Sequence, residues 1–228
     1  MLRAMVLSFP KFRNWALRLV CGALFAASTL PVVAQETPPI VKTESGGLAV
    51  ELSGLRLVFP QPIWTVVSSE PIEQAKVRYN EVAQNVHSIV LLPVDATVVT
   101  WTHLMGVLIV GRADYKRDTQ LASVIDPMMQ ACANNAFHVA TFGTEEKGAV
   151  VALCGRYRPG AEAIPVRCGG GIILATVLAS PKGSAKVYDE WCTPVFDPAD
   201  IATWPISEPD LSRYAEILVE TSSLTPIE

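Results

Sequence analysis

The chain has 228 residues, half of them hydrophobic, with 18 Lys and Arg against 22 Asp and Glu and a formal net charge of −4 at pH 7. Its basic residues come singly or in isolated pairs, so there is no basic patch to hold a phosphate backbone, and nucleic acid is not expected as a partner. The length suits one ordinary domain with a hydrophobic core and requires no second one.

Residues 1–34 have the composition of a secretory signal peptide. They contain no acidic residue and four basic ones, Arg3, Lys11, Arg13 and Arg18. The uncharged run over 19–30 is shorter than the about 20 apolar residues that span a bilayer, and it leads into a small-residue cleavage pattern that ends at Ala34. We expect cleavage after Ala34, no stable membrane span afterwards, and a periplasmic or secreted protein. The alternative is an uncleaved membrane anchor.

Cleavage would make the remaining chain more acidic. The first 34 residues hold four of the 18 basic residues and none of the 22 acidic ones, so 194 residues with a net charge of −8 would remain. Residues 35–47 contain two prolines and two glycines without periodicity, which predicts a disordered lead-in. We expect a single domain over 48–222 and a tail over 223–228.

The first half of the predicted domain is rich in strands. Residues 48–59 alternate apolar and polar side chains around Ser53 and Gly54, which predicts a hairpin with a two-residue loop. Asp95 is placed to cap a short helical segment that runs through Trp101. Alternating patterns or short apolar runs predict further strands at 64–68, 75–80, 88–92 and 104–110.

The longest predicted helix covers residues 121–132, where apolar side chains recur every three or four positions and form one stripe. Pro127 lies within it. Either the helix is kinked there, or Asp126 caps a second helix with Pro127 in its first turn. A C-terminal helix is expected after Ser207, a capping residue followed by Pro209 in the first turn.

Two hairpins are predicted between these helices. The first joins apolar runs at 137–142 and 149–156 through the polar turn 143–148, and the second joins 172–179 and 184–191 through the Pro-Lys-Gly turn at 181–183. Because the strands come as adjacent hairpins rather than alternating with helices, we expect the α+β class. The predicted fold is an antiparallel sheet of hairpins with one long helix and a C-terminal helix packed on one face.

Four cysteines remain after the predicted cleavage: Cys132, Cys154, Cys168 and Cys192. An even number in an oxidising compartment favours two disulfides, for which three pairings exist. The first hairpin would return Cys154 beside Cys132, and the second would return Cys192 beside Cys168, so we favour these two pairs. The alternative is a zinc site, which lacks the support of a C-x-x-C pair.

Two segments resemble small exported proteins of the PsbP/Mog1-like class, LLPVDATVVTWTHLMGVLIV at 91–110 and IILATVLASPKGSAKVYDEW at 172–191. In that class a strand, a proline, a short capped helix with a tryptophan and a further strand precede a long helix on an antiparallel sheet. The second segment resembles the final hairpin of the class. The resemblance covers about residues 55–195 and implies a binding or assembly-accessory domain rather than an enzyme.

Catalytic signatures are absent from the sequence. It contains no G-x-S-x-G, no H-E-x-x-H, no P-loop and no dinucleotide-binding motif, and the Gly169-Gly170-Gly171 run leads into a predicted strand, so no cofactor is expected. A nucleophilic pair of Cys154 and His138 would need a free thiolate, which a disulfide removes. The three histidines, which could also converge on a metal ion, are scattered and more ordinary as surface or half-buried residues: His87, His103 and His138.

Tryptophan offers the remaining functional signal. Of the four that remain after cleavage, Trp64, Trp101 and Trp191 are expected in the core, and Trp204, in a proline-rich segment, is the candidate for contact with a partner. We expect a non-enzymatic accessory or binding domain for an unknown protein or hydrophobic partner in the cell envelope. The alternatives are a thiol-dependent or hydrolytic enzyme and a metal or small-ligand carrier.

Overall fold

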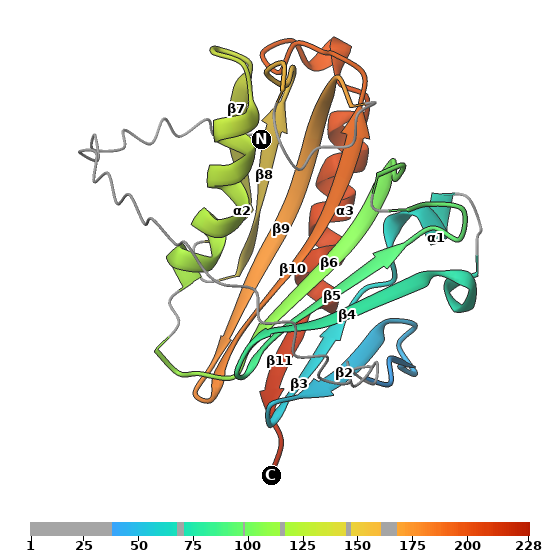
Figure 1. The fold of residues 1–228 in the computed structure, drawn as a ribbon, viewed down its shortest axis with the longest axis vertical. Helices are drawn as coiled ribbons and strands as arrows, with labels where there is room; N and C mark the ends of the chain where they lie inside the picture. Colours follow the sequence, from blue (N-terminus) through green and yellow to red (C-terminus); the bar gives the residue numbers. More distant parts are fainter. Residues whose placement is uncertain (1–37, 68–70, 98, 115–116, 145–146, 161–167) are drawn as a thin grey trace, which may run out of the picture. The chain divides into compact units, whose positions relative to one another are not determined.

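Antiparallel strands are the main secondary structure of the residues that the structure, a computed structural model, describes (Figure 1). The described residues are 38–67, 71–97, 99–114, 117–144, 147–160 and 168–228. The predicted signal peptide at 1–34 and its cleavage site lie outside them. Among the described residues, no helix combines the length and the hydrophobicity needed to cross a bilayer.

The larger of two sheets has seven strands in the order β4-β5-β6-β10-β9-β8-β7, and every neighbouring pair is antiparallel. Five of the connections join strands that are neighbours in the sheet, and the sixth runs from β6 through helix α2 to β7 at the far edge. Its strands are β4 (Lys76–Ala83), β5 (Val86–Leu92), β6 (His103–Val110), β7 (Phe137–Gly143), β8 (Gly148–Cys154), β9 (Gly170–Ser180) and β10 (Gly183–Thr193).

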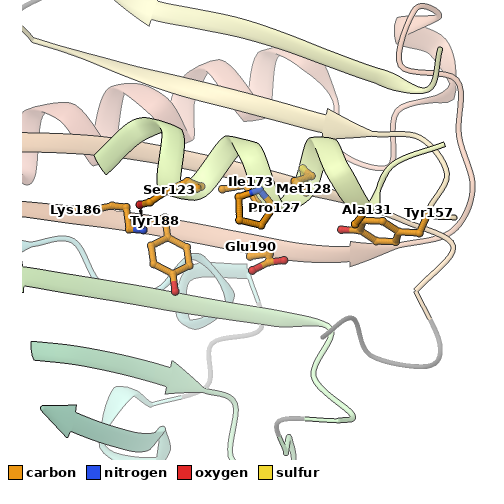
Figure 2. Close-up of a pocket in the computed structure, with 10 residues that line it drawn as sticks. Ser123, Pro127, Met128, Ala131, Tyr157, Ile173, Lys186, Tyr188 and Glu190 are labelled. Carbon is orange, nitrogen blue, oxygen red and sulfur yellow. Dashed lines mark hydrogen bonds between the residues drawn. The ribbon is translucent and has the colours of Figure 1, made fainter. Parts of the chain in front are cut away.

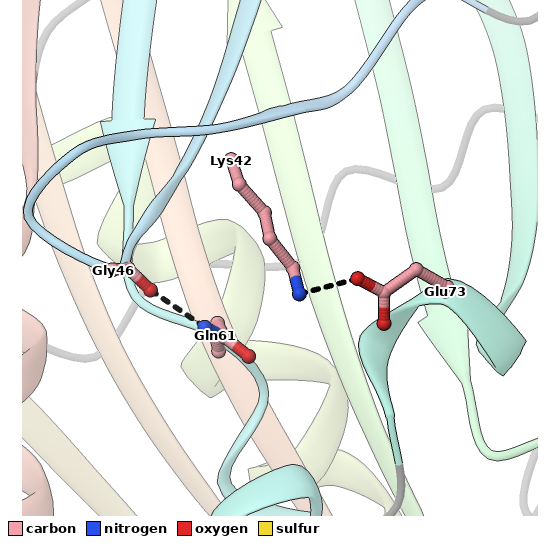
Figure 3. Close-up of polar contacts among 4 residues, drawn as sticks. All are labelled: Lys42, Gly46, Gln61 and Glu73. Carbon is pink, nitrogen blue, oxygen red and sulfur yellow. Dashed lines mark hydrogen bonds and ion pairs between the residues drawn. The ribbon is translucent and has the colours of Figure 1, made fainter.

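The smaller sheet has four strands in the order β1-β2-β3-β11. Ser53 and Gly54 join β2 and β3 with φ values of 51° and 71°, as the predicted two-residue hairpin requires. Figure 3 shows how the segments around this sheet are tied: Gln61 donates a hydrogen bond to the carbonyl of Gly46 at 2.7 Å, and Lys42 pairs with Glu73. The strands are β1 (Val41–Lys42), β2 (Leu48–Leu52), β3 (Leu55–Phe59) and β11 (Ser223–Pro226).

The main core fills the space between the two sheets. Side chains alternate along each strand, so one face of the large sheet, which we call the core face, carries residues such as Leu174 and Val187, both fully buried. Leu57 and Phe59 of the small sheet pack in the same cluster. Helix α3 (Glu208–Thr221) adds a stripe to this cluster, comprising Leu211, Ala215 and Leu218.

Helix α2 (Arg117–Ala131) lies on the other face of the large sheet, which we call the α2 face (Figure 1). Its Val124 and Met128 pack against Ala152 of β8 and Ile173 of β9, which point away from the core face. The helix runs through Pro127 without a break, so Asp126 starts no second helix.

The predicted α+β class is therefore wrong. The fold is β-rich, with two antiparallel sheets, and the two long helices cover opposite faces of the larger sheet instead of sharing one. The physical reason is the second sheet: it takes up part of the core face, and α3 completes that face, so the stripe of α2 packs on the opposite side.

Several local predictions also need correction. Residues 63–67 form helix α1 (Ile63–Val67) rather than a strand, because the burial of Trp64 outweighs the strand preference of the β-branched residues that follow it.

The described part of 95–101 has turns and no helix. Residues 41–42 of the predicted disordered lead-in form β1, and 223–226 of the predicted tail form β11. Two 3₁₀ turns complete the described elements, Ile72–Gln74 and Ile201–Thr203.

The two disulfides pair as the hairpin argument predicts. Cys132 bonds to Cys154 with a Cα–Cα distance of 5.6 Å, and Cys168 bonds to Cys192 with a Cα–Cα distance of 5.1 Å. The C-terminal helix also begins as expected, with the Ser207 hydroxyl accepting a hydrogen bond from the backbone amide of Asp210. The two disulfides fit a compartment in which thiols oxidise.

Candidate functional site

The alternative of a nucleophilic pair of Cys154 and His138 is not formed. Cys154 lies opposite Phe137 in the β7–β8 hairpin, whereas His138 lies opposite Leu153. Successive residues of a strand point to opposite faces, so His138 and Cys154 point to opposite sides of the sheet. Because Cys154 is also bonded to Cys132, it has no thiol to act as a nucleophile.

The tryptophans divide as the sequence suggests. Trp64, Trp101 and Trp191 are buried. Trp204 is half-buried, packs against the main core and donates from its indole nitrogen to the carbonyl of Pro198 at 3.3 Å. Its predicted contact with a partner stays a prediction.

The histidines lie apart from one another. Among the described residues, no three His, Cys, Asp or Glu side chains are grouped so that they could hold a metal ion. His87 instead joins the two sheets: its Nε2 lies 2.6 Å from the Ser53 hydroxyl and its Nδ1 lies 2.9 Å from the Tyr79 hydroxyl.

A pocket of about 240 Å³ opens on the α2 face, along the edge of α2 above β9 and β10 (Figure 2). Sequence analysis named none of its residues as a candidate site residue. Its apolar side comes from α2 and β9, and its polar groups come mainly from β10. The lining residues are Ser123, Val124, Pro127, Met128, Ala131, Tyr157, Ile173, Lys186, Tyr188 and Glu190.

Helix α2 is held beside this pocket by two side-chain hydrogen bonds to β10. Gln120 donates to the Ser184 hydroxyl at 2.5 Å, and Lys186 donates from Nζ to the Ser123 hydroxyl at 3.1 Å. The Cys132–Cys154 disulfide fixes the chain just after the other end of the helix. The pocket wall is thus anchored at both ends.

Two glycines make room for the tyrosine rings of the pocket. Gly106 of β6 lies directly opposite Tyr188, and a Cβ atom at Gly106 would overlap the Tyr188 ring. A Cβ atom at Gly171 would likewise overlap the hydroxyl end of Tyr157. Each ring therefore lies against a bare stretch of the sheet backbone.

Lys186, Tyr188 and Glu190 alternate with core-face residues along β10 and so share the α2 face. The Lys186 ammonium group lies 5.2 Å from the centre of the Tyr188 ring, within range of a cation–π interaction. Burial lowers the pKa of Lys186 to about 8, although the nearby Glu190 carboxylate acts in the opposite direction.

Glu190 is a half-buried carboxyl group that forms no ion pair within 4 Å among the described residues. Burial raises its pKa to about 7, and the attraction of Lys186 opposes that shift only in part. In Figure 2 its carboxylate lies between the labelled rings of Tyr188 and Tyr157. Burial and the Glu190 charge together raise the pKa of Tyr188 to about 12 and raise that of Tyr157 as well, so both phenols stay protonated at neutral pH.

The arrangement places one cationic and one anionic group in a partly apolar pocket without pairing them to each other. Lys186 and Glu190 are four positions apart along β10, so their Cα atoms are separated by about 13 Å at about 3.3 Å per residue. Groups with pKa values moved toward neutrality by burial in a concave site are typical of functional sites.

One signal in the sequence could have indicated this site. In β10 the charged residues fall on both sides of the alternation, since Asp189 lies on the core face and Lys186 and Glu190 on the other. A strand with one buried and one solvated face normally carries charged residues on the solvated face only. Charged residues on both faces of β10 therefore indicate a functional site. The helix that turns this face into a pocket is distant in sequence and gave no such signal.

Neither a known protein family model nor a curated protein sequence matches this chain. The resemblance to PsbP/Mog1-like proteins therefore stays a prediction.

Proposed function

We propose that this protein is exported, matures with two disulfides and binds a small polar ligand without catalysing a reaction on it. The observation that carries the proposal is the pocket on the α2 face, where Lys186 and Glu190 are partly withdrawn from water without an ion-pair partner among the described residues. Withdrawing charges from water is unfavourable unless something pairs with them, and a ligand would supply that pairing.

Export is supported by the sequence of residues 1–34 and by the disulfides. The full chain, expressed with its own N-terminus in a host with a secretory pathway, should be recovered outside the cytoplasm with Gln35 as its first residue and with no free thiol. Mass spectrometry of the intact and alkylated protein measures both. A cytoplasmic product that keeps Met1 and has five reactive thiols, Cys21 included, would contradict the export proposal.

Ligand binding is tested with solutes from the protein's own compartment. The protein is dialysed against the low-molecular-weight fraction of that compartment, and retained compounds are identified by mass spectrometry. At least one solute should be enriched on the wild type and lost on Ala131→Phe, which fills the pocket. The control Met129→Phe places the same ring on the exposed side of α2, where Met129 is 44% exposed.

Equal retention by the wild type and Ala131→Phe, with both folded, would contradict a function at this pocket. That result would favour the second candidate function, which is hydrolysis.

The second candidate is a hydrolase based on Ser53, as the short contact to His87 Nε2 at 2.6 Å suggests. If Nδ1 of His87 carries the proton and donates to Tyr79, Nε2 is free to accept the Ser53 hydroxyl proton, as in a nucleophile–base pair. A fluorophosphonate probe should then bond its phosphorus to the Ser53 oxygen, with loss of fluoride and transfer of the proton to His87. Peptide mapping that finds Ser53 unlabelled would remove this candidate.

A further inference from the structure

We propose that the pocket takes a dipolar ligand, with its cationic group beside Glu190 between the two tyrosine rings and its anionic group beside Lys186. This inference deepens the proposed function and rests on it. It assigns a ligand class, an amino acid or related zwitterion whose two charges are separated by an apolar spacer, and it assigns one residue to each end.

The cationic end is argued from what surrounds Glu190. A carboxylate between two neutral phenol rings, with no ion pair among the described residues, offers both a counter-ion and aromatic faces to an ammonium or guanidinium group. Gly106 and Gly171 are needed for these rings to lie against the sheet, so the ring positions are built into the strands and not left to chance.

The anionic end is argued from Lys186. Its one hydrogen bond seen among the described residues goes to the Ser123 hydroxyl, a neutral acceptor, which leaves two of the three ammonium hydrogens for a carboxylate or similar group. Ser123 is exposed at the pocket mouth, so this end is open to an entering ligand.

The spacer is argued from the wall between the two charges. Val124, Met128 and Ile173 line the pocket there and offer only apolar contacts. Lys186 and Glu190 lie four positions apart on one strand, so a ligand with an apolar spacer between its two charges can contact both side chains. The volume of about 240 Å³ admits a small molecule and not a folded domain.

The test is a calorimetric titration of the full mature protein with defined compounds at pH 7.5. The probes are glycine, 4-aminobutanoate and 6-aminohexanoate, with hexylamine and hexanoate as singly charged controls. We expect 6-aminohexanoate to bind about tenfold more tightly than glycine, hexylamine or hexanoate.

Each end is then tested by one neutral substitution. Glu190→Gln should reduce the affinity for 6-aminohexanoate to that for hexanoate, and Lys186→Met should reduce it to that for hexylamine. The matched controls Glu44→Gln and Lys182→Met remove the same charges from exposed positions outside the pocket and should leave binding unchanged. Thermal unfolding of each variant verifies that it is folded.

The pH profile gives an independent readout. Glu190 must be ionised and Lys186 protonated, so affinity should be greatest between about pH 7 and pH 8 and fall on both sides. The other titratable groups that line the pocket are Tyr157 and Tyr188, which stay neutral across this range.

Three outcomes would overturn the inference: equal affinity for all probes, unchanged affinity in both pocket variants, or no binding of any probe. If none of the probes binds but dialysis identifies another solute that Ala131→Phe loses, the dipolar class is wrong and the binding function stands. If dialysis also identifies none, both proposals fail.

Discussion

The two faces of the large sheet are built from the same strands but differ in how completely they are covered and in how polar they are. On β10, Ala185, Val187 and Trp191 are buried on the core face, where a second sheet and α3 exclude water. On the α2 face the same strand presents Lys186 and Glu190, which a single helix covers only in part. The more completely buried core face is expected to contribute more to the stability of the fold than the α2 face, which can therefore accommodate polar groups.

Truncating an apolar residue on each face tests this division most strongly. Leu174 is fully buried on the core face, and Ile173 beside it lies on the α2 face. Leu174→Ala should lower the free energy of unfolding by about 4 kcal/mol and Ile173→Ala by about 2 kcal/mol. Urea denaturation under oxidising conditions measures both. Equal losses would show that the α2 face is as tightly packed as the core face.

Removing a disulfide should have the next largest effect. The Cys132–Cys154 bond closes a sequence separation of 22 residues and holds the chain after α2. Its replacement by two alanines should cost about 3 kcal/mol, mainly through the gain of freedom in the unfolded chain. The same replacement of Cys168 and Cys192, with a separation of 24, is the control for the α2 face. Ligand affinity should fall more in the first variant than in the second.

Asp189 is the exception on the core face, and it links stability to pH. It is 3% exposed, and burial raises its pKa to about 8, although a hydrogen bond from the Ile63 backbone amide opposes the shift. The folded state therefore holds a proton that the unfolded state releases near pH 4, so this group's contribution is full below pH 4 and is lost as the pH rises toward 8.

Asp189→Asn should remove this dependence. The variant should match the wild type at pH 4 and exceed it by on the order of 2 kcal/mol at pH 8, as thermal unfolding across the range would show. A wild type whose stability does not fall between pH 4 and pH 8 would speak against a neutral Asp189.

The substitution with the smallest expected effect on stability, at Gly106, best distinguishes an effect on ligand binding from an effect on folding. Gly106→Ala places a methyl group where the Tyr188 ring lies, and the ring is the end of a side chain that can turn away. We expect a change of about 1 kcal/mol or less in the free energy of unfolding, together with a clear loss of affinity for 6-aminohexanoate. Retained affinity would mean that the Tyr188 ring position does not matter for binding.

The sequence predicted the features that depend on neighbouring residues. The Ser53-Gly54 hairpin, the β9–β10 hairpin and the Ser207 cap all rest on local signals, and the disulfide pairs follow from the hairpins. Helix α1 was missed because Thr65, Val66 and Val67 favour strands, and only the tertiary contacts of Trp64 decide otherwise.

The layers and the pocket could not be predicted in the same way. The side of the sheet on which α2 packs is decided by the second sheet, whose last strand lies far from β3 in the sequence. Lys186 and Glu190 resembled the solvated side of an ordinary strand, because nothing local indicated that α2 would lie across them. Long-range packing created the candidate site.

The pairing of the last strand, β11, determines where the chain can be shortened or tagged. Residues 223–226 pair with β3 along the edge of the small sheet, so a chain shortened at Ser222 would leave without partners those backbone amides and carbonyls of 55–58 that face β11 and not β2. Exposed edges of this kind recruit strands from neighbouring molecules. An affinity tag is therefore better attached through a spacer after Glu228 than substituted for these residues, and a shortened chain that self-associates would be an artefact of the missing strand.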